Sequence, residues 1–113
     1  MNLAEQQCVA CRPGAPPVSE QELEDFLSQY PKWEVIEEDG IPQLKRRFRF
    51  KDYSQAVSFV NQIAELAQEE DHHPALLLEW GLVTVTWWTH VIRGLHQNDL
   101  IMAARTEGAF RQS

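Results

Sequence analysis

The segment from Leu82 to His90 constrains the fold more than any other part of this 113-residue chain. It is rich in Val, Thr and Trp, which favour strands, and its period of two sorts the side chains onto two faces. Residues 76–80 predict a partner strand before it, because Gly81 permits a tight turn between the two. The expected core face carries Val83, Val85 and Trp87, and the opposite face carries Thr84, Thr86, Trp88 and His90.

A second strand pair is predicted earlier in the chain. Trp33 and Val35 begin one strand, Asp39-Gly40 is a strong turn signal, and residues 44–50 supply the next strand. In that second strand, Leu44, Arg46, Phe48 and Phe50 are expected on one side, and Lys45, Arg47 and Arg49 on the other, solvated side.

Helical patterns precede and separate these two hairpins. The first helix begins at a capping box, Ser19–Glu22, and ends at Pro31. The second begins at a similar pattern, Asp52–Gln55, and has apolar residues at helical spacing to about Glu69.

A third helix is expected near the end of the chain, capped by Asn98 or Asp99. The resulting order is α-β-β-α-β-β-α, which defines an α+β fold with a four-stranded antiparallel sheet and helices packed on one face. Residues 19–113 form a single domain in this prediction. Residues 1–18, which contain Pro13, Gly14 and two further prolines, form a loosely ordered N-terminal arm.

The charge of the chain excludes some classes of function. Its formal net charge is −7, so we do not expect it to bind nucleic acid, whose phosphates require a basic surface. No apolar run of 18 residues predicts a membrane span. Residues 1–7 lack the apolar core of a secretory signal, so a cytoplasmic location is expected.

Two cysteines, Cys8 and Cys11, form a C-x-x-C pattern in the Pro/Gly-rich arm. A zinc site needs four ligands, and the chain has no second cysteine pair. A thioredoxin-type motif would stand between a strand and a helix. The simplest interpretation is that the two cysteines are free thiols in a loosely ordered tail. Two alternatives stay open: the cysteines supply half of the ligands of a metal site, or they form a redox pair.

Three of the four histidines stand near predicted strand ends. His72 and His73 occupy the corner between the second helix and the third strand, before Pro74, and His90 ends the fourth strand. Two groups that titrate near neutral pH in one corner indicate acid–base chemistry. Ordinary hydrogen-bonded roles stay open.

A metal site is the main rival for these histidines. His72, His73 and His90, together with Asp71 or Asp99, are suitable ligands. Adjacent side chains of an extended segment point to opposite faces, however, which makes joint ligation awkward. No H-x-H, H-x-x-x-H or H-E-x-x-H spacing is present. We therefore predict no metal.

Neighbouring groups have more than one interpretation. Asp99 can cap the last helix, orient a nearby histidine, or do both. Trp87 or Trp88 can stack on a flat heterocycle. His96 and the Glu69-Glu70 run are expected to be ordinary solvated groups.

The run from Glu70 to Pro74, the later Thr89-His90, and then Gly94-Leu95 and Asp99 resemble the pterin-4a-carbinolamine dehydratase family. The resemblance covers residues 19–108, and the stretch 79–90 is similar to the bacterial branch found alongside phenylalanine hydroxylase. Gln68 stands where many members of the family have Glu.

The resemblance implies dehydration of 4a-hydroxytetrahydrobiopterin to quinonoid dihydropterin and water, without cofactor or metal. The enzyme would recycle the cofactor of an aromatic amino acid hydroxylase. It further implies a homodimer or homotetramer, with phenylalanine hydroxylase as a partner. An interaction or transcriptional coactivator role, and a dehydratase in another pterin pathway, are the alternatives. The catalytic residues implied are His72, His73 and His90, and the substrate-binding residues are Asp71, Pro74, Thr89, Val91, Ile92 and Asp99.

Overall fold

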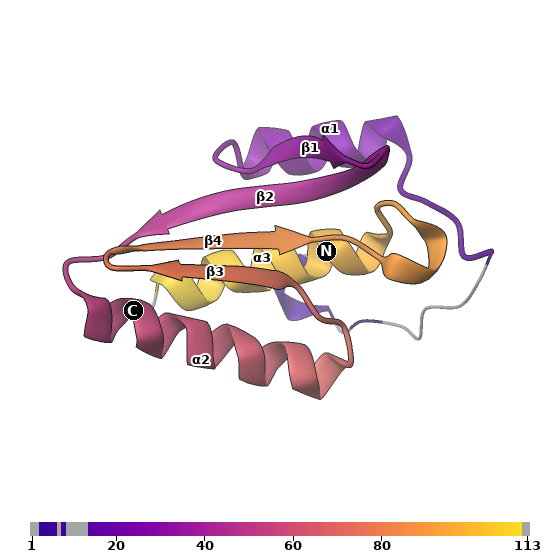
Figure 1. The fold of residues 1–113 in the computed structure, drawn as a ribbon. Coiled ribbons are helices and arrows are strands. Elements are labelled where there is room, and N and C mark those ends of the chain that lie inside the picture. The colour runs from indigo at the N-terminus through magenta and orange to yellow at the C-terminus, as the bar shows by residue number, and fades with distance from the viewer. Residues whose placement is uncertain (1–2, 7, 9–13, 112–113) are drawn as a thin grey trace.

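A computed structural model describes residues 3–6, 8 and 14–111 of the chain (Figure 1). Its longer elements follow the predicted order α-β-β-α-β-β-α. Two short 3₁₀ turns, η1 (Leu3–Glu5) and η2 (His90–Ile92), complete the described elements. The longer elements are α1 (Glu20–Gln29), β1 (Glu34–Glu38), β2 (Ile41–Arg49), α2 (Tyr53–Glu70), β3 (Ala75–Glu79), β4 (Leu82–Trp87) and α3 (Gln97–Arg111).

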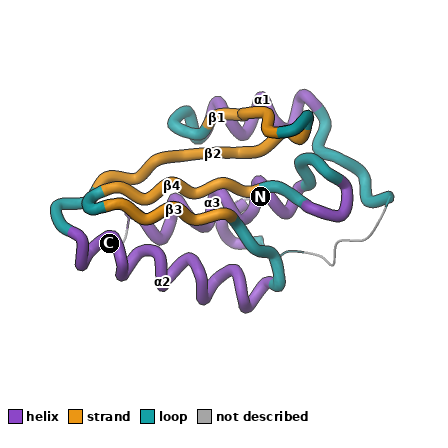
Figure 2. Tube along the Cα trace, in the orientation of Figure 1, coloured by secondary structure: helices purple, strands orange, loops and turns teal. Residues whose placement is uncertain are grey.

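The four strands form one antiparallel sheet in the order β1-β2-β4-β3. Each predicted hairpin is present, and the two hairpins join through β2 and β4, where Leu44 lies opposite Trp87. The helices pack against one side of this sheet (Figures 1 and 2). The predicted fold class is confirmed.

The core lies between the sheet and the helices. Leu44 and Phe48 of β2 and Val83, Val85 and Trp87 of β4 are fully buried there. These are the residues that the period of two assigned to the core face, so that prediction is confirmed. Helix α2 contributes its own apolar stripe, which comprises Ala56, Phe59, Ile63 and Ala67.

The predicted capping signals begin the first two helices. Ser19 Oγ accepts a hydrogen bond from the Glu22 N–H, and the Glu22 carboxylate accepts one from the Ser19 N–H. Asp52 caps α2 by accepting from the Gln55 N–H. Each cap satisfies an N–H that has no partner within its helix.

Strand β4 ends three residues earlier than expected, so His90 is not part of it. Thr89 and Gly94 exchange two backbone hydrogen bonds, of 2.8 and 3.3 Å, which close a tight loop. Within that loop, His90–Ile92 form η2, and Arg93 follows in the left-handed region. The strand is therefore shorter than predicted, but His90 still lines the same face of the sheet as Thr84, Thr86 and Trp88, as the alternation predicted.

Arg46 lies on the same side of β2 as Leu44 and Phe48, as the alternation predicted, although it is charged. It lies buried on the core face, paired with Glu107 of α3, which also accepts a 3.0 Å hydrogen bond from the Trp33 indole. Its guanidinium stacks over the Phe48 ring at 4.2 Å. Burial, and secondarily the charge of Arg111, lowers the pKa of Arg46.

The predicted arm, residues 1–18, lies partly outside the described residues, as does Cys11. In the part that is described, Leu3, Ala4, Cys8 and Val18 pack against the core cluster. Among the described helices, none is both long enough and apolar enough to cross a membrane.

Candidate active site

Two segments leave the same end of the β3–β4 hairpin. The ladder between these strands ends at the pair Ala75 and Thr86. The segment 72–74 leads from α2 into β3, and the segment 88–92 leads away from β4. The register of the sheet therefore brings together the two parts of the chain in which the sequence analysis placed the site.

The end of α2 fixes where the paired histidines emerge. Asp71 adopts the left-handed conformation (φ 49°, ψ 43°), and its N–H donates to the Gln68 carbonyl at 3.3 Å. The N–H of His72 reaches back to the Ala67 carbonyl at 3.1 Å. This bonding pattern terminates a helix sharply. As a result, His72 is buried, with 7% of its surface exposed, while His73 is exposed.

His72 is held by a buried carboxylate. Its Nε2 lies 2.6 Å from Asp99 Oδ1, and Asp99 has no exposed surface. The imidazole also stacks in parallel on the Trp87 indole, with 5.7 Å between ring centroids and 3° between planes. The ring is thus fixed both in its plane and along one edge.

Asp99 accepts two more hydrogen bonds through its other oxygen. The Thr89 hydroxyl donates to Oδ2 at 2.7 Å, and the backbone N–H of His96 donates to the same atom at 2.9 Å. This last bond also caps the start of α3. Helix α3 begins at Gln97, so the prediction that Asn98 or Asp99 is its N-cap is wrong by two to three residues. Asp99 instead supports the first turn from inside the helix, and it also contacts a histidine, as the second interpretation expected.

His96 was expected to be solvated, and that expectation is wrong. It is buried, and its Nδ1 accepts a 3.0 Å hydrogen bond from the Asn98 N–H in the first turn of α3. His96 thus acts as the side-chain cap of the helix that positions Asp99. Histidine is an unusual N-cap residue, so the sequence offered no signal for this role.

The two exposed histidines have looser contacts. His73 Nε2 lies 3.1 Å from Gln68 Oε1. The ring of His90 packs against Trp88, with 4.5 Å between centroids. Both imidazoles are accessible, unlike that of His72.

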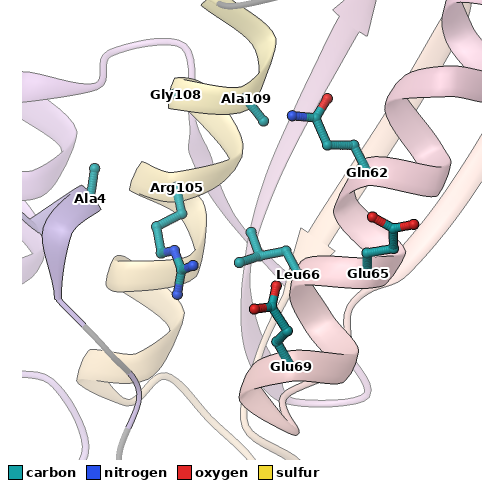
Figure 3. A pocket seen from close by; sticks show the side chains of 8 residues that line it. All are labelled: Ala4, Gln62, Glu65, Leu66, Glu69, Arg105, Gly108 and Ala109. Atoms are coloured by element: carbon teal, nitrogen blue, oxygen red, sulfur yellow. The ribbon is translucent and has the colours of Figure 1, made fainter.

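Trp88 and His90 border a hollow of about 580 Å³ on the face of the sheet opposite the helices. Polar side chains such as Gln43 and Thr86 line the hollow together with apolar ones such as Ile36. This combination is typical of ligand sites. A separate groove between α2 and α3 contains none of the histidines (Figure 3). Residues that line the hollow include Ile36, Gln43, Lys45, Leu77, Thr86, Trp88 and His90.

The remaining predicted site residues lie around this cluster. Asp71 and Val91 are exposed, and Pro74 and Ile92 are half-buried. The structure joins His72, Thr89 and Asp99 by direct contacts, whereas His73 and His90 contact other partners. Within the described ranges, no group of three or more His, Cys, Asp or Glu side chains could hold a metal ion.

Comparisons with known proteins agree with one another. Residues 16–109 match the family model described as Pterin 4 alpha carbinolamine dehydratase. The chain is 50% identical to a Gloeobacter violaceus protein, covering 99% of this chain and 97% of that protein. It is 55% identical to a Marinobacter nauticus protein, covering 94% and 96%. Both relatives are named pterin-4-alpha-carbinolamine dehydratase as a provisional assignment.

Two solved structures are also similar. A transcriptional coactivator/pterin dehydratase from Brucella melitensis superposes with a TM-score of 0.75 at 32% identity, covering 83% of this chain and 98% of that one. A pterin dehydratase-like protein, identified as a RuBisCO assembly factor in the alpha-carboxysome, gives a TM-score of 0.60 at 25% identity, covering 69% and 88%.

Proposed function

The chain belongs to the pterin 4 alpha carbinolamine dehydratase family, and on that premise we propose that it dehydrates 4a-hydroxytetrahydrobiopterin by histidine acid–base catalysis. The contact of His72 with Asp99 is the observation that supports this proposal most directly. A carboxylate accepts hydrogen bonds, so the proton of a neutral His72 ring resides on Nε2. The Nδ1 lone pair is then the one left for a substrate hydrogen bond.

Exposure separates the roles of the three histidines. A group that exchanges a proton with a substrate must come within hydrogen-bond distance of it. His73 and His90 are exposed, whereas His72 keeps only 7% of its surface exposed and its Nε2 is held by Asp99. We assign proton transfer to His73 and His90, and to His72 a hydrogen bond from Nδ1 that orients the pterin ring without proton transfer.

The proposed reaction needs one acid and one base. Carbon 4a of the substrate bears the hydroxyl, and the adjacent ring nitrogen carries a proton. The acid protonates the departing hydroxyl, the C–O bond breaks, and water leaves. The base removes the nitrogen's proton, whose bonding pair becomes the new C=N bond. No oxidation state changes, so the acid–base pair supplies what the step requires.

The hollow beside Trp88 suits the flat pterin ring. The half-buried Trp88 lines this hollow beside the exposed His90, so an aromatic surface lies close to a proton donor or acceptor. The half-buried Pro74 and Ile92, with the exposed Val91, belong to the segments that border this end of the sheet. We propose that they contact the substrate together with Asp71 and Thr89.

The test is ultraviolet-monitored dehydration of freshly formed 4a-hydroxytetrahydropterin. We expect His73→Ala and His90→Ala each to lower kcat/KM at least about tenfold, since a positioned acid or base contributes about 10²–10⁴-fold. Tyr53→Ala serves as the control, because Tyr53 is exposed at the far end of the 18-residue α2. A wild-type rate no faster than buffer would refute the proposed activity.

A second candidate function is protein–protein interaction. In the described part of the chain, no helix covers the sheet face that carries Leu77, which is 57% exposed. Two structural relatives are named as a coactivator and as an assembly factor, which suits a role of this kind. If His73→Ala and His90→Ala variants kept full biological function in cells, the interaction role would replace the catalytic one.

We further propose that the enzyme serves an aromatic amino acid hydroxylase and assembles as a homodimer or homotetramer. Each edge strand, β1 and β3, pairs on one side only within the described residues, so both offer backbone groups for assembly. Light scattering after size-exclusion chromatography measures the assembly state. A pull-down with phenylalanine hydroxylase tests that enzyme as a partner.

A further inference from the structure

We propose that the segment before α1 is a strap that positions the candidate active site, and that Glu70 is the positioning residue to which it is fastened. Only the expected change in dehydration rate rests on the proposed function; the expected change in hydrogen exchange does not. The strap is defined here as the described residues 3–6, 8 and 14–18. Its contacts are with Glu70, which precedes His72 by two residues, and with Leu95 and Asn98, which precede Asp99.

The first fastening is at the end of α2. The backbone N–H of Cys8 donates a 2.7 Å hydrogen bond to Glu70 Oε1, across 62 positions of sequence. Glu70 is the last residue of α2, and Asp71 and His72 follow it directly. A hydrogen bond to a charged acceptor is among the stronger bonds in proteins. The strap therefore holds the turn from which His72 and His73 emerge.

The second fastening is around the start of α3. The Val18 N–H donates to the Leu95 carbonyl at 2.9 Å, and Cys8 Sγ lies 3.9 Å from the Asn98 carbonyl. Leu95 and Asn98 flank His96, whose N–H and side chain fix the first turn of α3 and so the position of Asp99. Cys8 by itself therefore contacts residues near both ends of the His72–Asp99 contact, namely Glu70 and Asn98.

Helix α3 adds a weaker tie to the same carboxylate. Arg105 Nη1 lies 3.5 Å from Glu70 Oε1 and is partly exposed. Figure 3 shows Arg105 among the residues lining the groove between α2 and α3, with Ala4 of η1 beside them. This ion pair is long and partly exposed to solvent, so the 2.7 Å hydrogen bond from Cys8 is the stronger of the two contacts of Glu70.

The strap has a physical reason to affect the site. Helix α2 ends at Glu70, and the left-handed Asp71 turns the chain there, so the contacts of Glu70 determine where His72 and His73 leave the helix. Small displacements of catalytic groups, of about 1 Å, can cost about 10²-fold in rate. A strap that joins the two segments limits such displacements.

The direct test measures the His72 Nε2–H by nuclear magnetic resonance, as its rate of exchange with solvent. This readout needs no substrate. We expect Glu70→Ala to accelerate that exchange at least about tenfold, as loss of one hydrogen bond to a charged group predicts. Glu70→Gln keeps an acceptor for the Cys8 N–H but loses the charge, so its exchange rate should lie between those of wild type and Glu70→Ala.

Matched variants separate the strap from general effects. Glu69→Ala removes the same charge one residue earlier, from an exposed side chain, and should leave exchange unchanged. Cys8→Pro removes the donating N–H, whereas Cys8→Ala keeps it. We expect Cys8→Pro to behave like Glu70→Ala. Cys8→Ala keeps the N–H but removes the 3.9 Å contact of Sγ with the Asn98 carbonyl, so its exchange rate should lie between those of wild type and Cys8→Pro.

Dehydration kinetics give the second readout. Glu70→Ala should lower kcat about tenfold with KM within about twofold, because it displaces groups rather than removing a binding contact. Equal exchange rates in Glu70→Ala and Glu69→Ala would overturn the strap, whatever the kinetics. Faster exchange in Glu70→Ala, in a protein that has no dehydratase activity, would support the strap and refute the proposed function.

Discussion

Replacing Asp99 with Asn changes one buried atom in the cluster that holds His72. Three donors converge on the carboxylate, namely His72 Nε2, the Thr89 hydroxyl and the His96 N–H. An amide offers a single oxygen and an NH₂ group. The backbone N–H of His96 cannot reverse its role, so the amide oxygen must face it. The NH₂ group then faces His72 and forces its proton from Nε2 to Nδ1.

The size of the expected effect follows from the change of acceptor. The variant keeps a contact with His72 but loses its hydrogen bond to a charged group, and such a bond contributes about 1.5–3 kcal/mol. With 1.36 kcal/mol per tenfold change, kcat should fall about 10- to 150-fold. If the same loss appears in the free energy of unfolding, Tm should fall by about 6–12 °C, taking about 4 °C per kcal/mol for a domain of this size.

Initial dehydration rates, thermal melts and the two imidazole ¹⁵N shifts of His72 test these expectations together. Asp52→Asn is the matched control. Asp52 caps α2 from an exposed position, and Asn is as good an N-cap as Asp, so that variant should resemble wild type. An Asp99→Asn protein with wild-type rate, Tm and ¹⁵N shifts would show that the carboxylate does not set the tautomer of His72.

Three further substitutions test the scaffold by chemical denaturation. Asp71→Asn keeps a residue that tolerates the left-handed conformation and removes a negative charge from the C-terminal end of α2. The free energy of unfolding should therefore rise by about 0.3–1 kcal/mol, because a helix C-terminus disfavours negative charge. Equal stability would contradict the dipole argument. Gly81→Ala places a Cβ 2.9 Å from the Phe50 carbonyl oxygen and should destabilise the protein by about 1–3 kcal/mol. Gly108→Ala meets nothing within 4 Å on α3 and should instead stabilise it by about 0.5–1 kcal/mol; glycine variants that shift in the same direction would refute the packing argument.

Much of the scaffold could be predicted because it depends on local patterns. The Ser19 cap starts α1 and the alternation of residues 82–87 selects the core face, since a helix start and the two faces of a strand are properties of neighbouring residues. The turn at Asp39-Gly40 joins β1 and β2 for the same reason. Pro74 likewise marks the boundary between α2 and β3.

Long-range pairing limits the same approach. Arg46 stands in a run of basic residues, which by itself does not indicate a buried charge. Its burial is explained by the ion pair with Glu107, which lies 61 residues later in the sequence. Glu70 has the composition of a solvated helix end, yet the Cys8 N–H lies against it. Hydrogen bonds between distant residues leave no periodic trace, because either partner alone looks like an ordinary surface group.

The sequence by itself determined the order of elements, the inward face of each central strand and the segments that hold His72, His73 and His90. Only the tertiary structure decided that these histidines differ: His72 is buried against Asp99, while the other two stay exposed. The reason is physical. Which side chains are buried together depends on how helix ends and strand ends meet, and that is set by the packing of the whole sheet on its helices rather than by neighbouring residues.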